Sequence, residues 1–240
     1  MQNIKAIFFD LYDTLVNSRK AEKDASIEFK KLFQEFSNVN DNYFSNLWHK
    51  VAMEQYERYA RGEITYEKQK INRIKIIFLK FDIEKQDKEA EELFKKYLKL
   101  YEKNWKVFDD TIYVLEKLQK KYKLGIITNG DEIQQKNKLK LTKITNYFNS
   151  INISGEIGFS KPSKEIFEIA CKRINEKAEN CLMVGDSFKL DIQGALNSGL
   201  NAIWVNRKNE EIKFEKQIKE LKELCEKLKG DTYVVTKIQN

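Results

Sequence analysis

The chain of 240 residues is 41% hydrophobic, which is enough for a globular protein with a sizeable core. No apolar run approaches the roughly 20 residues of a membrane-spanning helix, so we expect a cytoplasmic protein. The net charge is +7, but lysine and glutamate alternate along the chain, as in EKQIKELKELCEKLKG, in the manner of solvated helix faces. Composition therefore argues against a membrane protein and indicates neither a nucleic-acid nor a membrane partner.

The first element expected is a buried strand over Ile4–Phe9, which runs directly into Asp10. A lysine- and glutamate-rich stretch follows over residues 18–104, with no proline and a single glycine, Gly62. Its apolar residues recur at helical spacing, which predicts several amphipathic helices, the first of them over AEKDASIEFKKLFQEF. Gly62 is placed to end one of these helices. We therefore expect an all-helical domain over residues 18–104.

Strands and helices alternate from about residue 105 onward. The expected strands are KLGIITN, SINIS, CLMVGD and NAIWVN, with helical stretches such as SKEIFEIACKRI and LDIQGALNSG between them. This alternation predicts a parallel sheet with helices on both faces. The first strand must join that sheet, so residues 1–17 and 105–240 are expected to form one α/β core, a doubly wound parallel sheet. A strand-like run, YVVTKIQN, ends the chain.

Polar side chains follow several of these strands. Asp10 follows the first, Thr128-Asn129-Gly130 the second and Asp186 the strand CLMVG, while Lys161 lies just beyond the short strand SINIS. Ligands of doubly wound sheets bind outside the carboxyl ends of the strands, so these residues are expected to converge. The helical domain springs from the end of the first strand and would lie over them as a cap.

Four motifs, FFDLYDTL, GIITNG, SKP and VGDSFKLD, occur in this order within residues 6–191. In these motifs and in its topology the chain resembles the haloacid dehalogenase (HAD) superfamily, in the branch with a helical cap inserted after the first strand. The segments TNGDEIQQKNKLKLTKITNYF and VGDSFKLDIQGALNSGLNAIWVN are most similar to the pyrimidine 5′-nucleotidase-like phosphatases.

The resemblance implies a nucleophile and a metal site. Asp10 would attack phosphorus and form an aspartyl-phosphate, which a carboxylate at a strand end held against a cation can do. Asp186 would bind Mg²⁺ directly and Asp191 would support it, since hard oxygen ligands suit this ion. Asp191 could instead cap its own helix. The family's metal also takes the backbone carbonyl at position 12, which Tyr12 supplies as well as aspartate does.

Five residues are expected to bind the phosphoryl group. Thr128 and Asn129 offer a hydroxyl and amide donors where phosphoryl oxygens would lie, and Thr14 could donate similarly. Gly130 leads into a helix whose N-terminus favours anions. Lys161 supplies a compact positive charge.

Tyr12 departs from the D-x-D pattern that phosphatases of the family usually carry at positions 10 and 12. Tyrosine at this position is typical of the 2-haloacid dehalogenases, which attack carbon and need no metal. Their fourth motif usually lacks the glycine-aspartate pair that VGDSFKLD keeps. Without a cation, three gathered carboxylates would repel one another, which also favours a metal site.

We therefore expect a Mg²⁺-dependent phosphatase for small phosphate monoesters, with nucleoside 5′-monophosphates as candidates and Tyr12 in place of the leaving-group acid. A metal-independent 2-haloacid dehalogenase that uses Asp10 as its nucleophile and a catalytically weak binding protein on the same fold stay open. The single histidine, His49, is expected on a surface helix, so nothing indicates a Ser-His-Asp triad. The three cysteines lack metal-ligand spacing and are expected to be free, mostly buried thiols.

Overall fold

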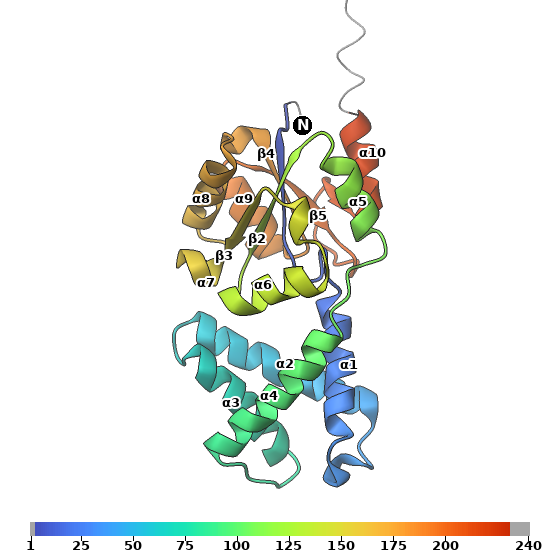
Figure 1. Ribbon diagram of the computed structural model, residues 1–240, viewed down its shortest axis with the longest axis vertical. Coiled ribbons are helices and arrows are strands. Elements are labelled where there is room, and N and C mark those ends of the chain that lie inside the picture. Colours follow the sequence, from blue (N-terminus) through green and yellow to red (C-terminus); the bar gives the residue numbers. More distant parts are fainter. Residues whose placement is uncertain (1–2, 231–240) are drawn as a thin grey trace, which may run out of the picture. The chain divides into compact units, whose positions relative to one another are not determined.

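The computed structural model describes residues 3–230 (Figure 1). The chain divides into two compact units, of which residues 18–105 form one and the residues on either side form the other. Trp105, one residue beyond the expected end of the helical domain, belongs to the helical unit, where its ring packs edge-on against Tyr101. The strand-like run YVVTKIQN lies outside the described residues.

A six-stranded parallel sheet forms the centre of the α/β unit, in the order β3-β2-β1-β4-β5-β6. The strands are β1 Ala6–Phe9, β2 Lys123–Thr128, β3 Ser150–Ile153, β4 Cys181–Gly185, β5 Asn201–Val205 and β6 Gln217–Ile218. Apolar side chains fill both faces, and Phe8, Met183 and Trp204 pack in one cluster. The expected parallel sheet is confirmed, with β6 as an additional edge strand.

Helices cover both faces of the sheet, which confirms the doubly wound arrangement. Figure 1 shows α8 (Lys164–Ile174) and α9 (Gly194–Asn197) on one side, and α5 (Thr111–Leu118) and α10 (Lys222–Gly230) on the other. The segment EKQIKELKELCEKLKG was expected to present a solvated helix face, but the structure divides it into β6 and α10. Its leucines bury against the unit because they recur at helical spacing, at Leu221, Leu224 and Leu228.

Several shorter helical segments occur in the two units. They are α6 Glu132–Leu141, α7 Ser154–Ile157, three 3₁₀ turns at Gln34–Phe36, Thr145–Tyr147 and Ala178–Asn180, and a π-helix over Phe188–Gln193. The π-helix follows β4 directly and contains one of the predicted metal-site residues, Asp191. A π-helical turn is rare and often lies at a functional site.

The helical unit contains four longer helices, α1 Ser18–Lys30, α2 Asp41–Ala60, α3 Tyr66–Leu79 and α4 Asp87–Lys103. Gly62 follows α2 with a φ of +75°, the left-handed conformation that ends helices and that glycine adopts without strain. The first helix is shorter than expected, because Phe33 and Phe36 turn inward and pack against Phe78 at ring distances of 5.0 Å. The assignment of this unit as a cap over the site stays a prediction.

Within the described residues Cys171, Cys181 and Cys225 form no disulfide, and Cys171 and Cys181 are buried while Cys225 is half-buried. His49 lies in the helical unit, where its Nδ1 is 2.7 Å from Glu22 Oε1. Within residues 3–230, none of the helices combines the length and apolar character that crossing a bilayer requires.

Candidate active site

Two of the predicted aspartates lie side by side at the carboxyl edge of the sheet. Asp10 follows β1 and Asp186 follows β4, and these strands are neighbours at the point where the strand order reverses. The register pairs Phe9 with Val184, and the backbone N–H of Asp10 donates to the carbonyl of Val184 at 2.9 Å. The backbone therefore brings together two carboxylates from opposite parts of the sequence.

Asp191 completes a group of three carboxylates with Asp10 and Asp186. Each offers one oxygen, and these oxygens all lie within 4.8 Å of one another. Burial, and then repulsion by Asp10 and Asp191, raises the pKa of Asp186 to about 8. Burial raises the pKa of Asp191 to about 6, against the attraction of Lys161. Carboxylate oxygens that are so close and so costly to charge fit a hard divalent cation.

The backbone after β4 is shaped around Asp191. Its Oδ2 accepts a hydrogen bond from the backbone N–H of Ser187 at 2.9 Å, while its Oδ1 accepts from Lys161 at 2.6 Å. Asp191 therefore does stabilise the start of its own helix, while its Oδ1 bonds the same ammonium group that bonds Asp10. Gly185 makes this possible, because a Cβ there would lie 2.3 Å from Asp191 Oδ2.

Lys161 is the cation at the centre of the site. Its side chain is 3% exposed, and Nζ donates to Asp10 Oδ1 at 2.5 Å and to Asp191 Oδ1 at 2.6 Å. Burial alone would lower the pKa of Lys161, but the negative charges of Asp10 and Asp191 outweigh it and raise the pKa above its ordinary value. Lys161 is therefore charged and bridges the predicted nucleophile to the predicted metal site.

Asn129 contributes to the site by holding Lys161. Its Oδ1 accepts from the backbone N–H of Lys161 at 2.8 Å, and its Nδ2 donates to the backbone carbonyl of the same residue at 3.0 Å. The predicted phosphate donor therefore already positions another site residue, and its second Nδ2 hydrogen is the one that a phosphoryl oxygen could use.

The other predicted phosphate donors differ in whether their donor groups already have a hydrogen-bond partner. Thr14 and Thr128 are fully buried, and the Thr14 hydroxyl has no hydrogen-bond partner within the described part of the chain. The backbone N–H of Gly130 donates to Ser154 Oγ at 2.9 Å, so it is already used. Phosphate binding by these residues stays a prediction.

The expected anion site at the N-terminus of α6 stays a prediction, and a carboxylate of the chain itself already caps this helix. Asp131 is the N-cap of α6, and its Oδ1 accepts from the backbone N–H of Gln134 at 2.9 Å. One backbone N–H of the helix terminus is thus bonded to a carboxylate of the chain itself. Gly130 directly precedes the cap residue, and its φ of +135° is one that favours glycine.

Tyr12 contacts two residues of α6 that sequence reasoning missed. Nζ of Lys138 lies 3.2 Å from the centroid of the Tyr12 ring, and the Tyr12 hydroxyl donates to Gln134 Oε1 at 3.5 Å. Nothing in the sequence distinguished Lys138, because a buried lysine in a lysine-rich chain looks like its solvated neighbours. The spacing of four residues between Gln134 and Lys138 does place them on one face of a helix.

Lys208 is a second cation that sequence reasoning missed. Its Nζ lies 3.6 Å from Asp186 Oδ2 and 3.9 Å from Asp13 Oδ2, at the rim of the carboxylate cluster, with the side chain 60% exposed. The rule that polar residues after strands line the site would have found it, because Lys208 follows β5.

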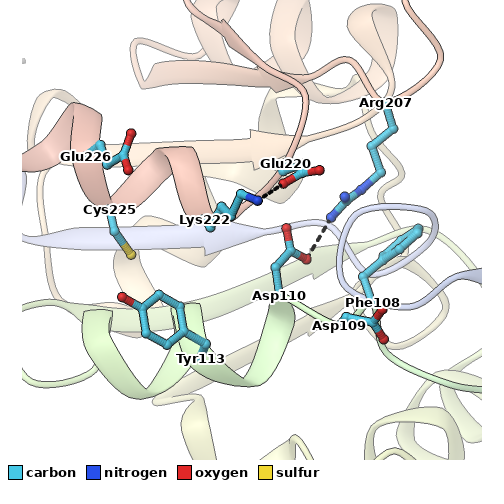
Figure 2. A pocket seen from close by; sticks show the side chains of 9 residues that line it. All are labelled: Phe108, Asp109, Asp110, Tyr113, Arg207, Glu220, Lys222, Cys225 and Glu226. Carbon is cyan, nitrogen blue, oxygen red and sulfur yellow. Dashed lines mark hydrogen bonds and ion pairs between the residues drawn. The ribbon is translucent and has the colours of Figure 1, made fainter.

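A separate pocket of about 690 Å³ lies between α5 and α10, and Asp10, Asp186 and Asp191 are not among its lining residues (Figure 2). Arg207 forms part of its wall, where the guanidinium stacks over the Phe108 ring and pairs with Asp110 at 3.2 Å. The same guanidinium donates to the backbone carbonyl of Thr14 at 3.4 Å. Arg207 therefore joins this pocket to the loop that follows the predicted nucleophile.

The doubly wound sheet and a carboxylate cluster at its switch point define an α/β enzyme that works from the carboxyl edge of its strands. A family model described as haloacid dehalogenase-like hydrolase matches residues 4–199. The chain belongs to this family of hydrolases, as its four motifs indicated.

Individual relatives are phosphatases. The chain is similar to N-acylneuraminate-9-phosphatase of Mus musculus, with 29% identity over 211 residues that cover 86% of this chain and 84% of that protein. It is also similar to pyrimidine 5′-nucleotidase YjjG of Escherichia coli (strain K12), with 38% identity over 101 residues, 42% of this chain and 45% of that protein. The resemblance to pyrimidine 5′-nucleotidase-like phosphatases is thereby confirmed.

Solved structures share the fold. The putative HAD-hydrolase YfnB from Bacillus subtilis, bound to magnesium, has a TM-score of 0.81 and 25% identity, and the match covers 95% of this chain and 99% of that one. Solved 2-haloacid dehalogenases also match, with identities of 15 to 23% that show the fold alone.

Proposed function

We propose that this hydrolase is a Mg²⁺-dependent phosphatase for small phosphate monoesters, with nucleoside 5′-monophosphates as candidate substrates. The observation that carries the proposal is the placement of Lys161, whose ammonium bridges Asp10 and Asp191 while the Asp186 carboxylate lies within reach of both. This arrangement puts a nucleophile, a fixed cation and a set of metal-binding oxygens in one place.

The chemistry follows from these groups. A carboxylate oxygen of Asp10 attacks phosphorus, the bond to the ester oxygen breaks, and the leaving alkoxide takes a proton from the Tyr12 hydroxyl. Water then attacks the aspartyl-phosphate and returns a proton to the Tyr12 oxygen, which releases inorganic phosphate and restores the Asp10 carboxylate. Lys161 stabilises the negative charge on the transferring group throughout. Asp10, Asp186 and Asp191, with the backbone carbonyl of Tyr12, would hold Mg²⁺, which when bound neutralises charge on the phosphoryl oxygens.

The relatives support this substrate class. The names of the two most informative ones, an N-acylneuraminate-9-phosphatase and a pyrimidine 5′-nucleotidase, both describe removal of phosphate from a small molecule. One name refers to an acylated sugar acid and the other to a pyrimidine nucleotide, so the phosphate group is the part they share. We therefore place the phosphoryl-binding part of specificity on the residues of the α/β unit described above.

A panel assay tests the proposal. Phosphate and halide release are measured on nucleoside monophosphates, sugar phosphates, nitrophenyl phosphate and 2-chloropropionate, each with Mg²⁺ and with chelator. We expect phosphate release that chelator abolishes and that Asp10→Asn removes. Asp82→Asn, which changes an exposed aspartate of the helical unit, is the matched control and should leave the rates unchanged.

The presence of tyrosine rather than aspartate at position 12 favours the second candidate, a metal-independent 2-haloacid dehalogenase. In that reaction Asp10 would attack the carbon that bears the halogen and displace halide, and water would then hydrolyse the ester. Chloride release from 2-chloropropionate that persists in chelator, without phosphate release from any ester, would replace the first proposal with this one.

A further inference from the structure

Lys138 is a fully buried lysine next to the candidate site. It lies on α6 with 0% of its surface exposed, and its Nζ is 3.2 Å from the centroid of the Tyr12 ring. Gln134, one helical turn earlier, accepts the hydroxyl of the same tyrosine at 3.5 Å. α6 therefore contacts both the face and the polar tip of Tyr12.

Burying a lysine is costly, so its surroundings must compensate. Burial lowers the pKa of Lys138, whereas the negative charges of Asp10 and Asp13 oppose that shift. An ammonium group gains further from the electron-rich face of an aromatic ring, and a neutral amine can still direct an N–H at that face. The contact with the Tyr12 ring is thus favourable in either protonation state.

α6 directly follows the loop Thr128-Asn129-Gly130, and this loop is bonded to the start of α7. The N-cap of α6 is Asp131, and the preceding Gly130 exchanges hydrogen bonds with the start of α7: its N–H donates to Ser154 Oγ at 2.9 Å, and its carbonyl accepts from Gly155 N–H at 3.0 Å. A side chain on α6 can therefore hold the Tyr12 ring at a defined place relative to Asn129 and Lys161.

We propose that Lys138 is a positioning residue for Tyr12. Its amine fixes the plane of the ring, with Gln134 fixing the hydroxyl, and so determines how well the phenol can serve a substrate whose leaving group needs a proton. This inference rests on the proposed phosphatase function, in which Tyr12 occupies the position of the leaving-group acid. Neither residue of α6 contacts the phosphoryl group in this account.

The test is a double-mutant cycle of Lys138→Met and Tyr12→Leu, measured with an alkyl phosphate and with nitrophenyl phosphate. Methionine keeps the length of the buried side chain and removes the amine. We expect Lys138→Met to lower kcat on the alkyl phosphate at least ~10-fold, within the range of a positioned acid, and on nitrophenyl phosphate by less than ~3-fold, since that leaving group departs as an anion.

The effect of Lys138→Met in the Tyr12→Leu variant distinguishes positioning of Tyr12 from a general structural role. Tyr12→Leu alone should cost as much on the alkyl phosphate as Lys138→Met, and adding Lys138→Met to it should change kcat by less than ~2-fold, because residues that act as a unit are not additive. Lys136→Met removes an exposed lysine of the same helix that pairs with Glu132, and it should leave both rates unchanged. Equal losses on both substrates, or losses that multiply in the double variant, would overturn the proposal.

Urea unfolding tests the contact between Lys138 and Tyr12 independently of catalytic activity. The shift of the urea midpoint caused by Lys138→Met should differ between the wild-type and Tyr12→Leu backgrounds, because the two side chains touch. Identical shifts would refute the contact and with it the positioning role. If the wild-type protein hydrolyses no phosphate ester, the proposed function fails, while this cycle still decides whether Lys138 holds Tyr12.

Discussion

At the scale of single residues, Lys161 links the predicted nucleophile, a predicted metal-site residue and a predicted phosphate donor. Its ammonium lies between Asp10 and Asp191, and its backbone is held at two points by Asn129. Because the side chain is buried, few water molecules can replace it if it is removed. The two aspartates would then face each other without their shared cation, and their like charges would repel.

We expect Lys161→Ala to lower kcat for phosphate release at least ~10²-fold, by analogy with the loss of one transition-state donor. Lys164→Ala is the matched control, because Lys164 is an exposed lysine of α8 that pairs only with Glu168 at 2.8 Å among the ion pairs of the described residues. Steady-state kinetics at saturating Mg²⁺ measure both variants. A near-normal rate for Lys161→Ala would mean that the lysine is structural.

Tyr12→Asp tests the other unusual residue. A phenol with a pKa of about 10 can donate a hydrogen bond at neutral pH but is a poor base for the attacking water. A carboxylate at this position should raise turnover of sugar or nucleoside phosphates more than turnover of nitrophenyl phosphate. Lys138, whose amine already lies at the ring of Tyr12, can pair with the new carboxylate.

The comparison of the two substrate types provides the internal control. A folded Tyr12→Asp variant that binds Mg²⁺ but is no faster on either substrate would show that tyrosine is specifically required. In that case the dehalogenase alternative would be tested next, with halide release as the measurement.

At the scale of elements, the end of β4 and the π-helix that follows are fitted to each other. Gly185 closes the strand, and the space where its side chain would lie is taken by the carboxylate of Asp191. The strand and the helix can therefore bring Asp186 and Asp191 together only if the last residue of the strand has no Cβ.

We expect Gly185→Ala to displace Asp191 and to lower both Mg²⁺ affinity and activity by at least ~10-fold, the scale of perturbing a residue that orients metal ligands. Gly125→Ala in β2 is a suitable control, because its new Cβ would meet the Phe8 ring at 2.6 Å and so also overpacks the core. Both variants should lose on the order of 1–3 kcal/mol of stability. Isothermal titration with Mg²⁺ should separate them, with only Gly185→Ala binding the ion weakly.

The elements that the sequence predicted well are those with a long periodic signal. The apolar runs before Asp10 and Asp186 indicated buried parallel strands, and polar residues at their ends indicated a site there. β6 was missed because two residues cannot show an alternation. Lys138 was missed because its burial depends on how α6 packs against Tyr12, which no pattern in the sequence of α6 reveals.

At the scale of the whole molecule, metal binding and stability are linked. Asp10, Asp186 and Asp191 repel one another in the folded chain, whereas in the unfolded chain Asp10 is far from the other two and water screens all three charges. A cation that binds only the folded state therefore stabilises it by mass action.

We expect saturating Mg²⁺ to raise Tm by roughly 5–10 °C, which corresponds to about 2.7 kcal/mol at a hundredfold excess over Kd. Asp186→Asn should reduce this shift to nearly zero, because it removes one ligand, while its own Tm without metal should not fall, because it also removes a repelling charge. Differential scanning calorimetry with Mg²⁺ and with chelator measures both. A full shift in the Asp186→Asn variant would place the ion elsewhere.

The central position of β1 has a consequence for folding during synthesis on the ribosome. β1 is the first strand to be synthesised, yet it lies between β2 and β4, which begin only at Lys123 and Cys181. At about 5–20 residues per second, its first partner emerges on the order of ten seconds later. The four long helices made in the interval pack mostly on neighbours in sequence and can assemble at once. During this interval the nascent chain can therefore contain folded helices while the apolar segment AIFF has no strand to pair with.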